Sequence, residues 1–258
     1  ELPNVMNYLN ASLEAGHLDA EKLRPAANWV ETQAARLLDA VAPLQRAEGT
    51  KWRSEEDYCG MRAELSVHLD LLGIIPGISL DPLYRAAKLQ DPLLLLFAVV
   101  SMLKRGSEPS ASALLVCAKS HETRASLYKQ LQHLDRADLF PREFLTFEAF
   151  AAAAMTAWLL YPAELGYEPT SLELVAEVEG TKDGESVVMC LWKFTNDEGQ
   201  ALAGASGPYP ASRPIEPLWG QDTFSNFTEW AKLTPEEHLE KILGTLDNWK
   251  VAWCEGRM

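Results

Sequence analysis

The stretch 171-SLELVAEVEGTKDGESVVMCLWKF-194 decides the fold, because the hydrophobic pattern changes its period there. Apolar residues alternate with glutamates over 171–180, which predicts a strand with one buried and one solvent face. The turn signal Lys-Asp-Gly at 182–184 predicts a hairpin, and the apolar run 186–194 predicts a central return strand. With a turn at 196–199 and a strand at 200–206, the pattern indicates a three-stranded antiparallel meander. The alternation assigns two sets of side chains to opposite faces: Leu172, Leu174, Ala176 and Val178 against Glu173, Glu177 and Glu179.

Before this stretch the hydrophobic period is that of a helix. The segment after Ser54 has an apolar stripe spaced by three and four residues, which lies on one helical face. Its members are Tyr58, Met61, Leu65, Leu69 and Leu72. Ser54 is the expected N-cap of this helix, and Asp-Pro pairs begin the helices expected at 81–89 and 91–106. Further helices are expected at 108–120, 121–134 and 142–162, the last capped by Thr146 and ended by Pro162.

After the meander, a loop rich in proline and aromatic residues covers 207–230, and a last helix follows at 234–249. Thr234 and Glu237 match the capping-box pattern at its start. The expected fold is therefore α+β and mostly α: HEAT-like helical hairpins, then a small three-stranded antiparallel meander and a C-terminal helix. Two domains are expected, an all-helical one over 1–162 and a small α+β module over 163–258. The helix spacing is irregular, so a non-repeating bundle explains the helical part nearly as well.

The net charge of −14 is unevenly spread. Residues 1–150 hold 20 acidic and 16 basic residues, whereas residues 151–258 hold 17 acidic and 7 basic ones. Such a field repels nucleic acid and attracts a basic protein. Acidity for solubility alone is the alternative explanation. The residues expected to contact a basic partner are Glu173, Glu177, Glu179, Asp183, Glu185, Asp197, Glu198 and Trp219.

Signals for metal, cofactor and membrane binding are missing from the sequence. The four cysteines are far apart and have no histidine at metal-finger spacing, and the five histidines fall on separate elements. There is no phosphate-binding glycine loop, dinucleotide fingerprint or zinc-protease helix. The longest apolar runs, 92–103 and 149–162, are shorter than the roughly 20 residues of a membrane span. We therefore expect no cofactor, no metal and a cytoplasmic location. The chain begins with glutamate, so the removal of a leader peptide stays open.

Ser206 raises the question of nucleophilic catalysis, because it lies between glycines in the segment Gly204-Ala205-Ser206-Gly207-Pro208. The nucleophile elbow of α/β-hydrolases has glycines two residues before and two after the serine, at a turn into a helix. Here the second glycine comes one residue too early and a proline-rich segment follows. We interpret the segment as a strand end with closely packed glycines.

The segments from Leu131 to Glu179 and from Leu202 to Tyr209 resemble a group of uncharacterised bacterial proteins described as HEAT-repeat-containing. The matching positions are Trp158-Leu159, Tyr161-Pro162, Glu164-Leu165-Gly166, Pro169, Leu172-Glu173-Leu174-Val175, Gly204 and Ser206-Gly207-Pro208-Tyr209. The resemblance covers about residues 80–210. It departs where the family has an aromatic-rich segment before the glycine and this chain has Gly-Gln-Ala-Leu-Ala-Gly.

The resemblance implies a protein-binding scaffold rather than an activity. Together with the charge, it suggests a non-enzymatic immunity protein that binds and neutralises a basic bacterial toxin, favouring a nuclease. One alternative is a small-molecule enzyme or sensor that uses Ser206, Tyr209 and Glu164. A second is an adaptor or homodimer whose interface holds aromatic residues, namely Trp219, Phe224, Phe227 and Trp230.

Overall fold

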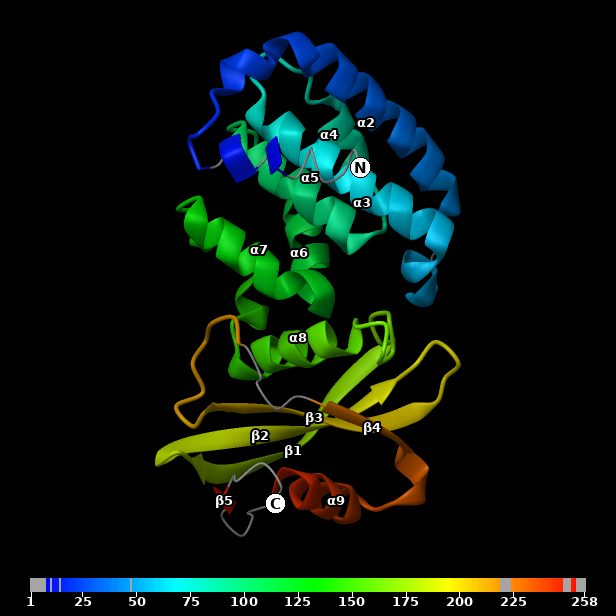
Figure 1. Ribbon diagram of the computed structural model, residues 1–258, viewed down its shortest axis with the longest axis vertical. Helices are drawn as coiled ribbons and strands as arrows, with labels where there is room; N and C mark the ends of the chain where they lie inside the picture. Colours follow the sequence, from blue (N-terminus) through cyan, green and yellow to red (C-terminus); the bar gives the residue numbers. More distant parts are fainter. Residues whose placement is uncertain are drawn as a thin grey trace. The chain divides into compact units, whose positions relative to one another are not determined.

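The computed structural model describes residues 8–9, 11–13, 15–46, 48–218, 224–247 and 252–253; within these, the side chains of 224–227, 243, 245–247 and 252–253 are left undescribed. The chain divides into two compact units (Figure 1). The first comprises Glu1–Glu48 and Trp52–Pro141, and the second comprises Gly49–Lys51 and Arg142–Met258. Each unit has its own hydrophobic core. The overall class is α+β with more helix than strand, as the sequence predicts.

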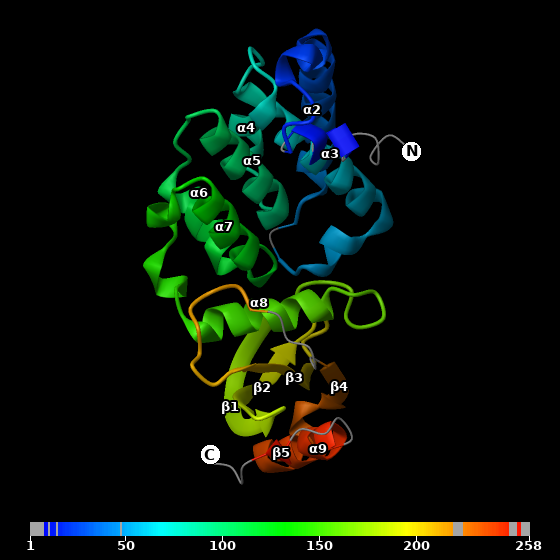
Figure 2. The ribbon, with the colours of Figure 1, turned by 60° about the vertical axis from the view of Figure 1, so that its left-hand side comes forward.

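The described part of the first unit is helical. Its α-helices are α2 (Ala27–Val41), α3 (Glu56–Ile74), α4 (Asp81–Ala86), α5 (Pro92–Lys104), α6 (Ala111–Lys119) and α7 (His121–His133). Short 3-10 turns precede or follow them at Ala20–Ala26, Ala42–Leu44, Lys51–Ser54 and Ala137–Leu139. Consecutive helices pack together, α4 with α5 and α6 with α7, and α3 packs against both α2 and α5 (Figures 1 and 2).

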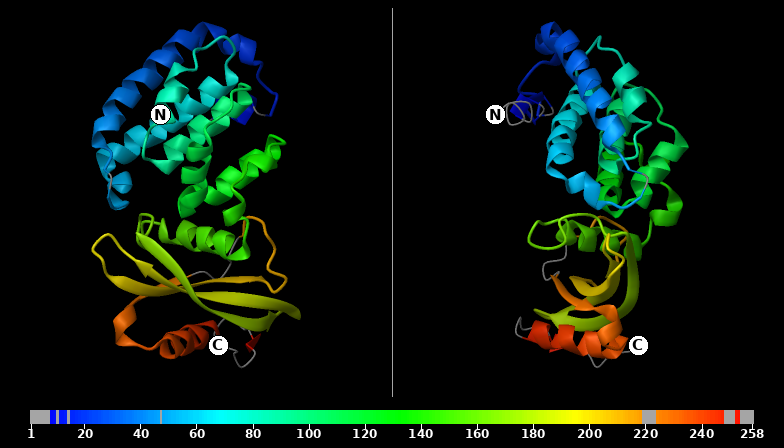
Figure 3. Two further views of the ribbon diagram at one scale, coloured as in Figure 1. Left: turned by 180° about the vertical axis from the view of Figure 1, so that it is seen from behind. Right: turned by 90° about the vertical axis from the view of Figure 1, so that its right-hand side faces the viewer.

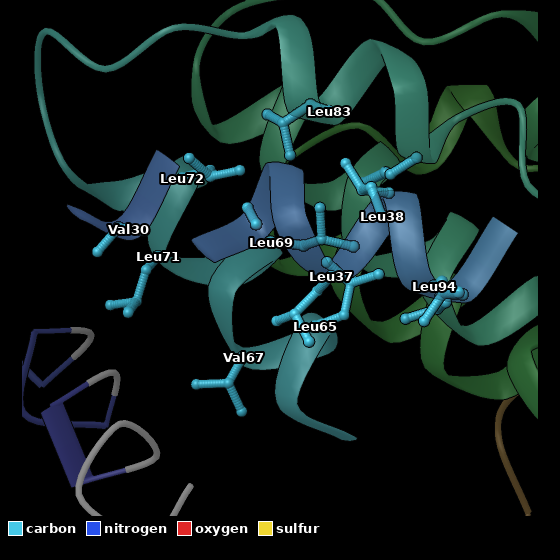
Figure 4. Close-up of a cluster of buried hydrophobic side chains, with 14 of the residues drawn as sticks. Val30, Leu37, Leu38, Leu65, Val67, Leu69, Leu71, Leu72, Leu83 and Leu94 are labelled. Atoms are coloured by element: carbon cyan, nitrogen blue, oxygen red, sulfur yellow. The ribbon is translucent and has the colours of Figure 1, made fainter. Parts of the chain in front are cut away.

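Helix α3 forms the centre of the first core. Its predicted stripe is buried at Tyr58, Leu65, Leu69 and Leu72, while Met61 packs against the cluster from its margin. Val67 and Leu71 are buried as well, so α3 is covered around most of its circumference. Figure 4 shows leucine and valine side chains from α2, α3, α4 and α5 meeting in this cluster.

Of the predicted N-caps of α3 and α5, that of α5 is present and that of α3 is not. The carboxylate of Asp91 accepts hydrogen bonds from the N–H groups of Leu93 (2.8 Å) and Leu94 (3.4 Å), which confirms the predicted start of α5. Ser54, in contrast, is not the N-cap of α3. It ends a 3-10 turn, and Glu55 takes the cap position without a side-chain hydrogen bond.

The second unit is a sheet with a helix on each face (Figure 3). Its strands are β1 (Ser171–Lys182), β2 (Glu185–Thr195), β3 (Ala201–Pro210), β4 (Phe224–Glu229) and β5 (Ala252–Trp253), all antiparallel in the order β4-β3-β2-β1-β5. The 3-10 turns Arg142–Phe144 and Trp230–Lys232 precede α8 (Phe147–Leu159) and α9 (Pro235–Asp247). The predicted meander β1-β2-β3 is present. Among the described residues the sheet has five strands rather than three, because the segment expected as a loop contributes β4 and the C-terminal segment contributes β5.

Helix α8 belongs to the second unit, whereas the sequence interpretation placed residues 142–162 in the helical domain. The reason is packing. Helix α8 shares a core with large side chains of the sheet, among them Trp192. Its contributing residues are Phe147, Ala151, Met155 and Leu159. On the other face, Ile242 and Leu239 of α9 pack with Met189 and Leu191 of β2 and Ala205 of β3.

A bulge in β1 changes which way its side chains point. Leu172 pairs with Phe194 and Leu174 with Trp192, but the register then shifts by one residue between Leu174 and Ala176. Because side chains alternate along a strand, one extra residue exchanges the two faces. Ala176 therefore pairs with Leu191 on the α9 face, and Glu177 pairs with Cys190 on the α8 face. The prediction that four apolar side chains of β1 share one face is wrong beyond Leu174.

Candidate functional site

The β1–β2 hairpin carries most of the acidic residues singled out in the sequence. Its turn is Asp183-Gly184, both with positive φ (52° and 85°), and Lys182 pairs with Glu185 across it. Two consecutive residues of positive φ are the hallmark of a type I′ turn, which matches the twist of the flanking strands. The turn therefore holds the side chains of Asp183 and Glu185 at an exposed tip.

The predicted acidic residues fall into two groups rather than one surface. The first group lies toward the hairpin tip and comprises Glu177, Glu179, Asp183 and Glu185. We call the hairpin with these four carboxylates the acidic hairpin. Glu173, Asp197 and Glu198 lie toward the other end of β2. Since β2 has 11 residues, the two ends are about 33 Å apart at about 3.3 Å per residue. Trp219 lies outside the described residues.

Glu177 and Glu179 share one internal cation, the guanidinium of Arg213. Its Nη2 lies 2.7 Å from Glu177 Oε2 and 3.1 Å from Glu179 Oε1, and its Nε donates to Glu177 Oε2 at 2.9 Å. The hydrogen bond to Glu177 raises the pKa of Arg213 above its ordinary value. The backbone of Arg213 has φ 50°, which is uncommon for a residue with a long side chain. Arg213 lies in a loop without local pattern, so nothing in the sequence signals this contact.

Asp183 and Glu185 differ from this pair. Both side chains are exposed, and within the described part of the chain neither carboxylate has a hydrogen bond or ion pair. Glu179 is the intermediate case, because its side chain keeps 64% of its surface exposed despite the contact with Arg213. The free negative charge of the acidic hairpin therefore concentrates at its tip.

At the other end of the sheet, Asp197 has a structural role. Its carboxylate accepts hydrogen bonds from the backbone N–H groups of Thr50 (3.1 Å) and Lys51 (2.8 Å). The Thr50 hydroxyl donates its single proton to the carbonyl of Glu168, and its oxygen lies 3.1 Å from Asp197 Oδ1. Asp197 thereby holds the segment Gly49–Lys51 on the second unit, and both of its carboxylate oxygens are used internally. The sequence interpretation assigned Asp197 to a partner.

The two remaining acidic candidates are less engaged. Glu173 lies on the α9 face opposite Lys193, with 3.7 Å between Oε2 and Nζ. Glu198 is exposed in the β2–β3 turn. The exposed Glu173–Lys193 pair contributes only about 0–1 kcal/mol, and Glu198 is an isolated charge. These two residues therefore do not form a concentrated acidic surface.

Ser206 and Tyr209, which the enzyme alternative used, lie in the core under α8. Ser206 is 0% exposed, and its hydroxyl accepts a 2.7 Å hydrogen bond from the indole Nε1–H of Trp192. Tyr209 is buried edge-to-face on Phe147, with 5.8 Å between ring centroids. The third residue, Glu164, lies half-buried in the segment after α8. Ser206 is thus a packed hydrogen-bonding residue of β3.

The segment of β3 just after Ser206 is shaped by close packing. Gly207 has φ 136°, and a Cβ there would lie 2.6 Å from Met189 Sδ and 2.9 Å from the Val188 carbonyl oxygen. The Gly207–Pro208 peptide bond is cis, and the register between β2 and β3 shifts at this point. The Ser-Gly-Pro-Tyr segment therefore includes a closely packed glycine, as expected, at an irregularity in the pairing of β2 with β3. The expected strand end is wrong, because β3 continues to Pro210.

A buried charged cluster in the first unit was not anticipated from the sequence. Arg62 of α3 binds Asp91 through Nε (2.7 Å) and Nη2 (3.0 Å), and its Nη2 binds Glu122 of α7 (2.9 Å). Tyr58 donates to Asp91 at 2.9 Å. Burial and the nearby Asp91 carboxylate raise the pKa of Tyr58, so its hydroxyl stays protonated. The cluster joins three helices, and its residues come from positions that no local pattern links.

The aromatic residues of the adaptor alternative are only partly described. Trp230 stacks on His238 of α9 with 4.6 Å between ring centroids, and His238 Nε2 lies 3.1 Å from the Trp230 carbonyl oxygen. Trp230 therefore packs within its own unit. Trp219 and the side chains of Phe224 and Phe227 lie outside the described residues.

Within the described ranges, no three or more His, Cys, Asp or Glu side chains are arranged to hold a metal ion. No helix in the same ranges is long and apolar enough to cross a membrane. Comparison of the chain with protein-family models, with curated proteins and with solved structures finds no significant match.

Proposed function

We propose that this protein binds a basic protein partner through the acidic hairpin, and that it acts as an immunity protein against a basic bacterial toxin, a nuclease being the favoured kind. The main support for the proposal is the pair of exposed carboxylates at the hairpin tip. There, the exposed carboxylates of Asp183 and Glu185 have no partner among the described side chains and lie close along β1 and β2 to the exposed Glu179.

The charge of the whole second unit supports the same role. The unit holds 19 acidic and 9 basic residues, a net charge of −10, whereas the first unit holds 18 acidic and 14 basic ones. Such a field accelerates the approach of a cationic partner and rejects like-charged ones. A nuclease must present cationic groups to phosphates, so a surface of carboxylates competes with its substrate for the same groups.

The helical unit and the cysteines fit the proposal. The resemblance to HEAT-repeat-containing bacterial proteins, which implies a binding scaffold, stays a prediction. A cytoplasmic location is part of the proposal, because the three described cysteines, Cys59, Cys117 and Cys190, are free thiols and a reducing compartment keeps them so.

The experiment uses the purified full chain and the purified basic products of the genes beside its own. Calorimetry compares the wild type with Asp183→Asn/Glu185→Gln. The control, Glu236→Gln/Glu240→Gln, removes two exposed charges from α9 of the same unit. Each rim charge contributes about 0.2–1 kcal/mol, so the hairpin variant, which removes two, should bind about two- to thirtyfold more weakly. The control should change the affinity less than twofold.

A partner that is a toxin adds a functional measurement. Stoichiometric wild-type protein should abolish its activity, and the hairpin variant should need a proportionally higher concentration. Binding should weaken as salt rises from 50 to 300 mM. Equal losses in the hairpin and control variants would show that net charge, and not this surface, determines binding. No binding to any such product would contradict the proposal itself.

A further inference from the structure

A segment that follows β3 is joined to the acidic hairpin through Arg213. Residues 211–218, which we call the strap, begin beside the hairpin, because Pro210 at the end of β3 pairs with Val187 of β2 (Figure 1). The far end of the strap is fixed as well, since Leu218 packs against the core under α8. Arg213 lies between these two ends, and its side chain crosses from the strap to the hairpin.

Arg213 binds the hairpin in the way that an arginine of a bound protein would. Its Nε and Nη2 donate to Glu177 Oε2 at 2.9 and 2.7 Å, and Nη2 also donates to Glu179 Oε1 at 3.1 Å. A guanidinium has several N–H donors in a rigid fork, so one group engages two carboxylates at once. The contact cancels one of the four negative charges of the acidic hairpin. A cationic partner therefore meets a hairpin whose two inner carboxylates already hold a cation.

This contact is only weakly held. The Arg213 side chain keeps 35% of its surface exposed, and solvent screens ion pairs at such positions. Its backbone, with φ 50°, is in the left-handed region, which is unfavourable for a residue with a Cβ. Leaving the hairpin would let the backbone return to an ordinary conformation. Because a screened attraction opposes an unfavourable backbone, a competing cation can break the contact.

We infer that Arg213 is an autoinhibitory cation: it occupies Glu177 and Glu179 in the free protein, and an arginine of the basic partner displaces it together with the strap. The inference rests on the proposed function and adds a regulatory contact to the same surface. Because the partner must replace the interactions that Arg213 loses, the contact lowers the affinity for every cationic protein that lacks a suitably placed arginine. Once Arg213 has left, all four carboxylates of the hairpin face the partner.

The test uses the full chain with a hexa-arginine peptide as the probe, and with the basic gene products used above. Calorimetry compares the wild type with Arg213→Gln. The control is Lys232→Gln, which removes the same charge and also breaks an exposed ion pair, that of Lys232 with Glu229 (3.1 Å). Glu229 pairs with Leu202, which lies opposite Phe194, so the control is near the end of β2 away from the hairpin.

Arg213→Gln should bind the peptide about two- to fivefold more tightly than the wild type, and the gain should exceed that of the control. In the background Glu177→Gln/Glu179→Gln the gain should vanish, because no contact is left to release. NMR of the wild type should show slow exchange of the Arg213 Nε–H with water in the free protein and fast exchange in the peptide complex. Continued protection in the complex would show that Arg213 stays in place, which overturns the inference.

The remaining outcomes separate this inference from the proposed function. Equal or weaker binding by Arg213→Gln, with Asp183→Asn/Glu185→Gln still impaired, would overturn autoinhibition and leave the proposed function intact. The expected gain with the peptide, but no binding to any basic gene product, would support Arg213 as a competing cation and contradict the proposed function. A gain that persists in Glu177→Gln/Glu179→Gln would show an effect of net charge alone and overturn the inference. Failure of the peptide to bind any variant would overturn it as well.

Discussion

The indole N–H of Trp192 donates a 2.7 Å hydrogen bond to the hydroxyl of Ser206, and both side chains are buried between the sheet and α8. The serine that the sequence presents between two glycines thus satisfies a tryptophan of the neighbouring strand. Its hydroxyl is engaged and sealed from solvent, so it has a structural role in the second unit.

Ser206→Ala should lower the stability of the second unit without affecting partner binding. The substitution leaves a buried indole N–H without an acceptor, which costs about 1–3 kcal/mol. Urea unfolding followed by tryptophan fluorescence measures the loss. Ser186→Ala, an exposed position of β2, is the control and should change stability by less than about 0.5 kcal/mol. Equal stability of the two variants would show that the hydrogen bond contributes nothing.

Gly207→Ala should destabilise the same region by a steric mechanism. Its Cβ would lie 2.9 Å from the backbone oxygen of Val188, which cannot move away as a flexible side chain can. Strain of this kind costs about 1–3 kcal/mol. Gly199→Ala is the comparison, because Gly199 also has a positive φ (79°) but has open space around its Cβ position. In urea unfolding, a smaller loss for Gly207→Ala than for Gly199→Ala would contradict the close approach.

Features that depend on a few neighbouring residues could be predicted from the sequence. The Asp183-Gly184 turn and the cap at Asp91 follow from local backbone chemistry. The caps at Thr146 and at Thr234 with Glu237 are likewise present as predicted, with Thr146 accepting from Ala149 N–H and Glu237 accepting from Thr234 N–H.

Features that depend on tertiary pairing could not be predicted in the same way. The bulge at Val175 is defined by the register with β2, and it alone moves Glu177 and Glu179 to the α8 face. Arg213, 34 residues away from Glu179, completes that site from a loop without pattern. Helix α8 is apolar and buried around most of its circumference, so its own sequence does not reveal which unit it joins.

Asp197→Asn should release the segment Gly49–Lys51 from the second unit. An amide nitrogen in place of one carboxylate oxygen faces N–H donors and removes at least one acceptor from Thr50 or Lys51. Exchange of the Thr50 and Lys51 amides should become at least tenfold faster, as measured by NMR. Glu198→Gln, which changes an exposed neighbour in the same turn, should leave these amides unchanged. Unchanged exchange in Asp197→Asn would contradict the assigned role.

Arg62→Gln should strongly destabilise the first unit. The substitution leaves Asp91 (0% exposed side chain) and Glu122 without their cation, and breaking a buried pair costs about 3–5 kcal/mol. Arg36→Gln is the control, since Arg36 makes a 3.6 Å pair with Glu64 at the surface. The control should lose at most about 1 kcal/mol in urea unfolding. Similar losses in both variants would show that Arg62 does not hold α3, α5 and α7 together.

The buried thiols should be unreactive in the native protein and should make it sensitive to alkaline pH. Burial raises the pKa of Cys117 to about 12 and raises that of Cys190 as well, whereas Cys59 is exposed. Iodoacetamide at pH 8 followed by peptide mass spectrometry should therefore label Cys59 and spare Cys117 and Cys190. Labelling of all three at one rate would contradict the buried positions.

The free energy of unfolding should fall as the pH rises above about 9. The unfolded chain loses the Cys117 proton near pH 9.0, while the folded chain retains it to about pH 12, so the unfolded state binds fewer protons between these values. Stability then falls with rising pH, by up to about 1.4 kcal/mol per pH unit for each such thiol. Urea midpoints at pH 8.0 and 10.5 should show this loss, and Cys117→Ala should reduce the difference between them. A midpoint that is the same at both pH values in the wild type would mean that these thiols ionise as readily in the folded as in the unfolded chain.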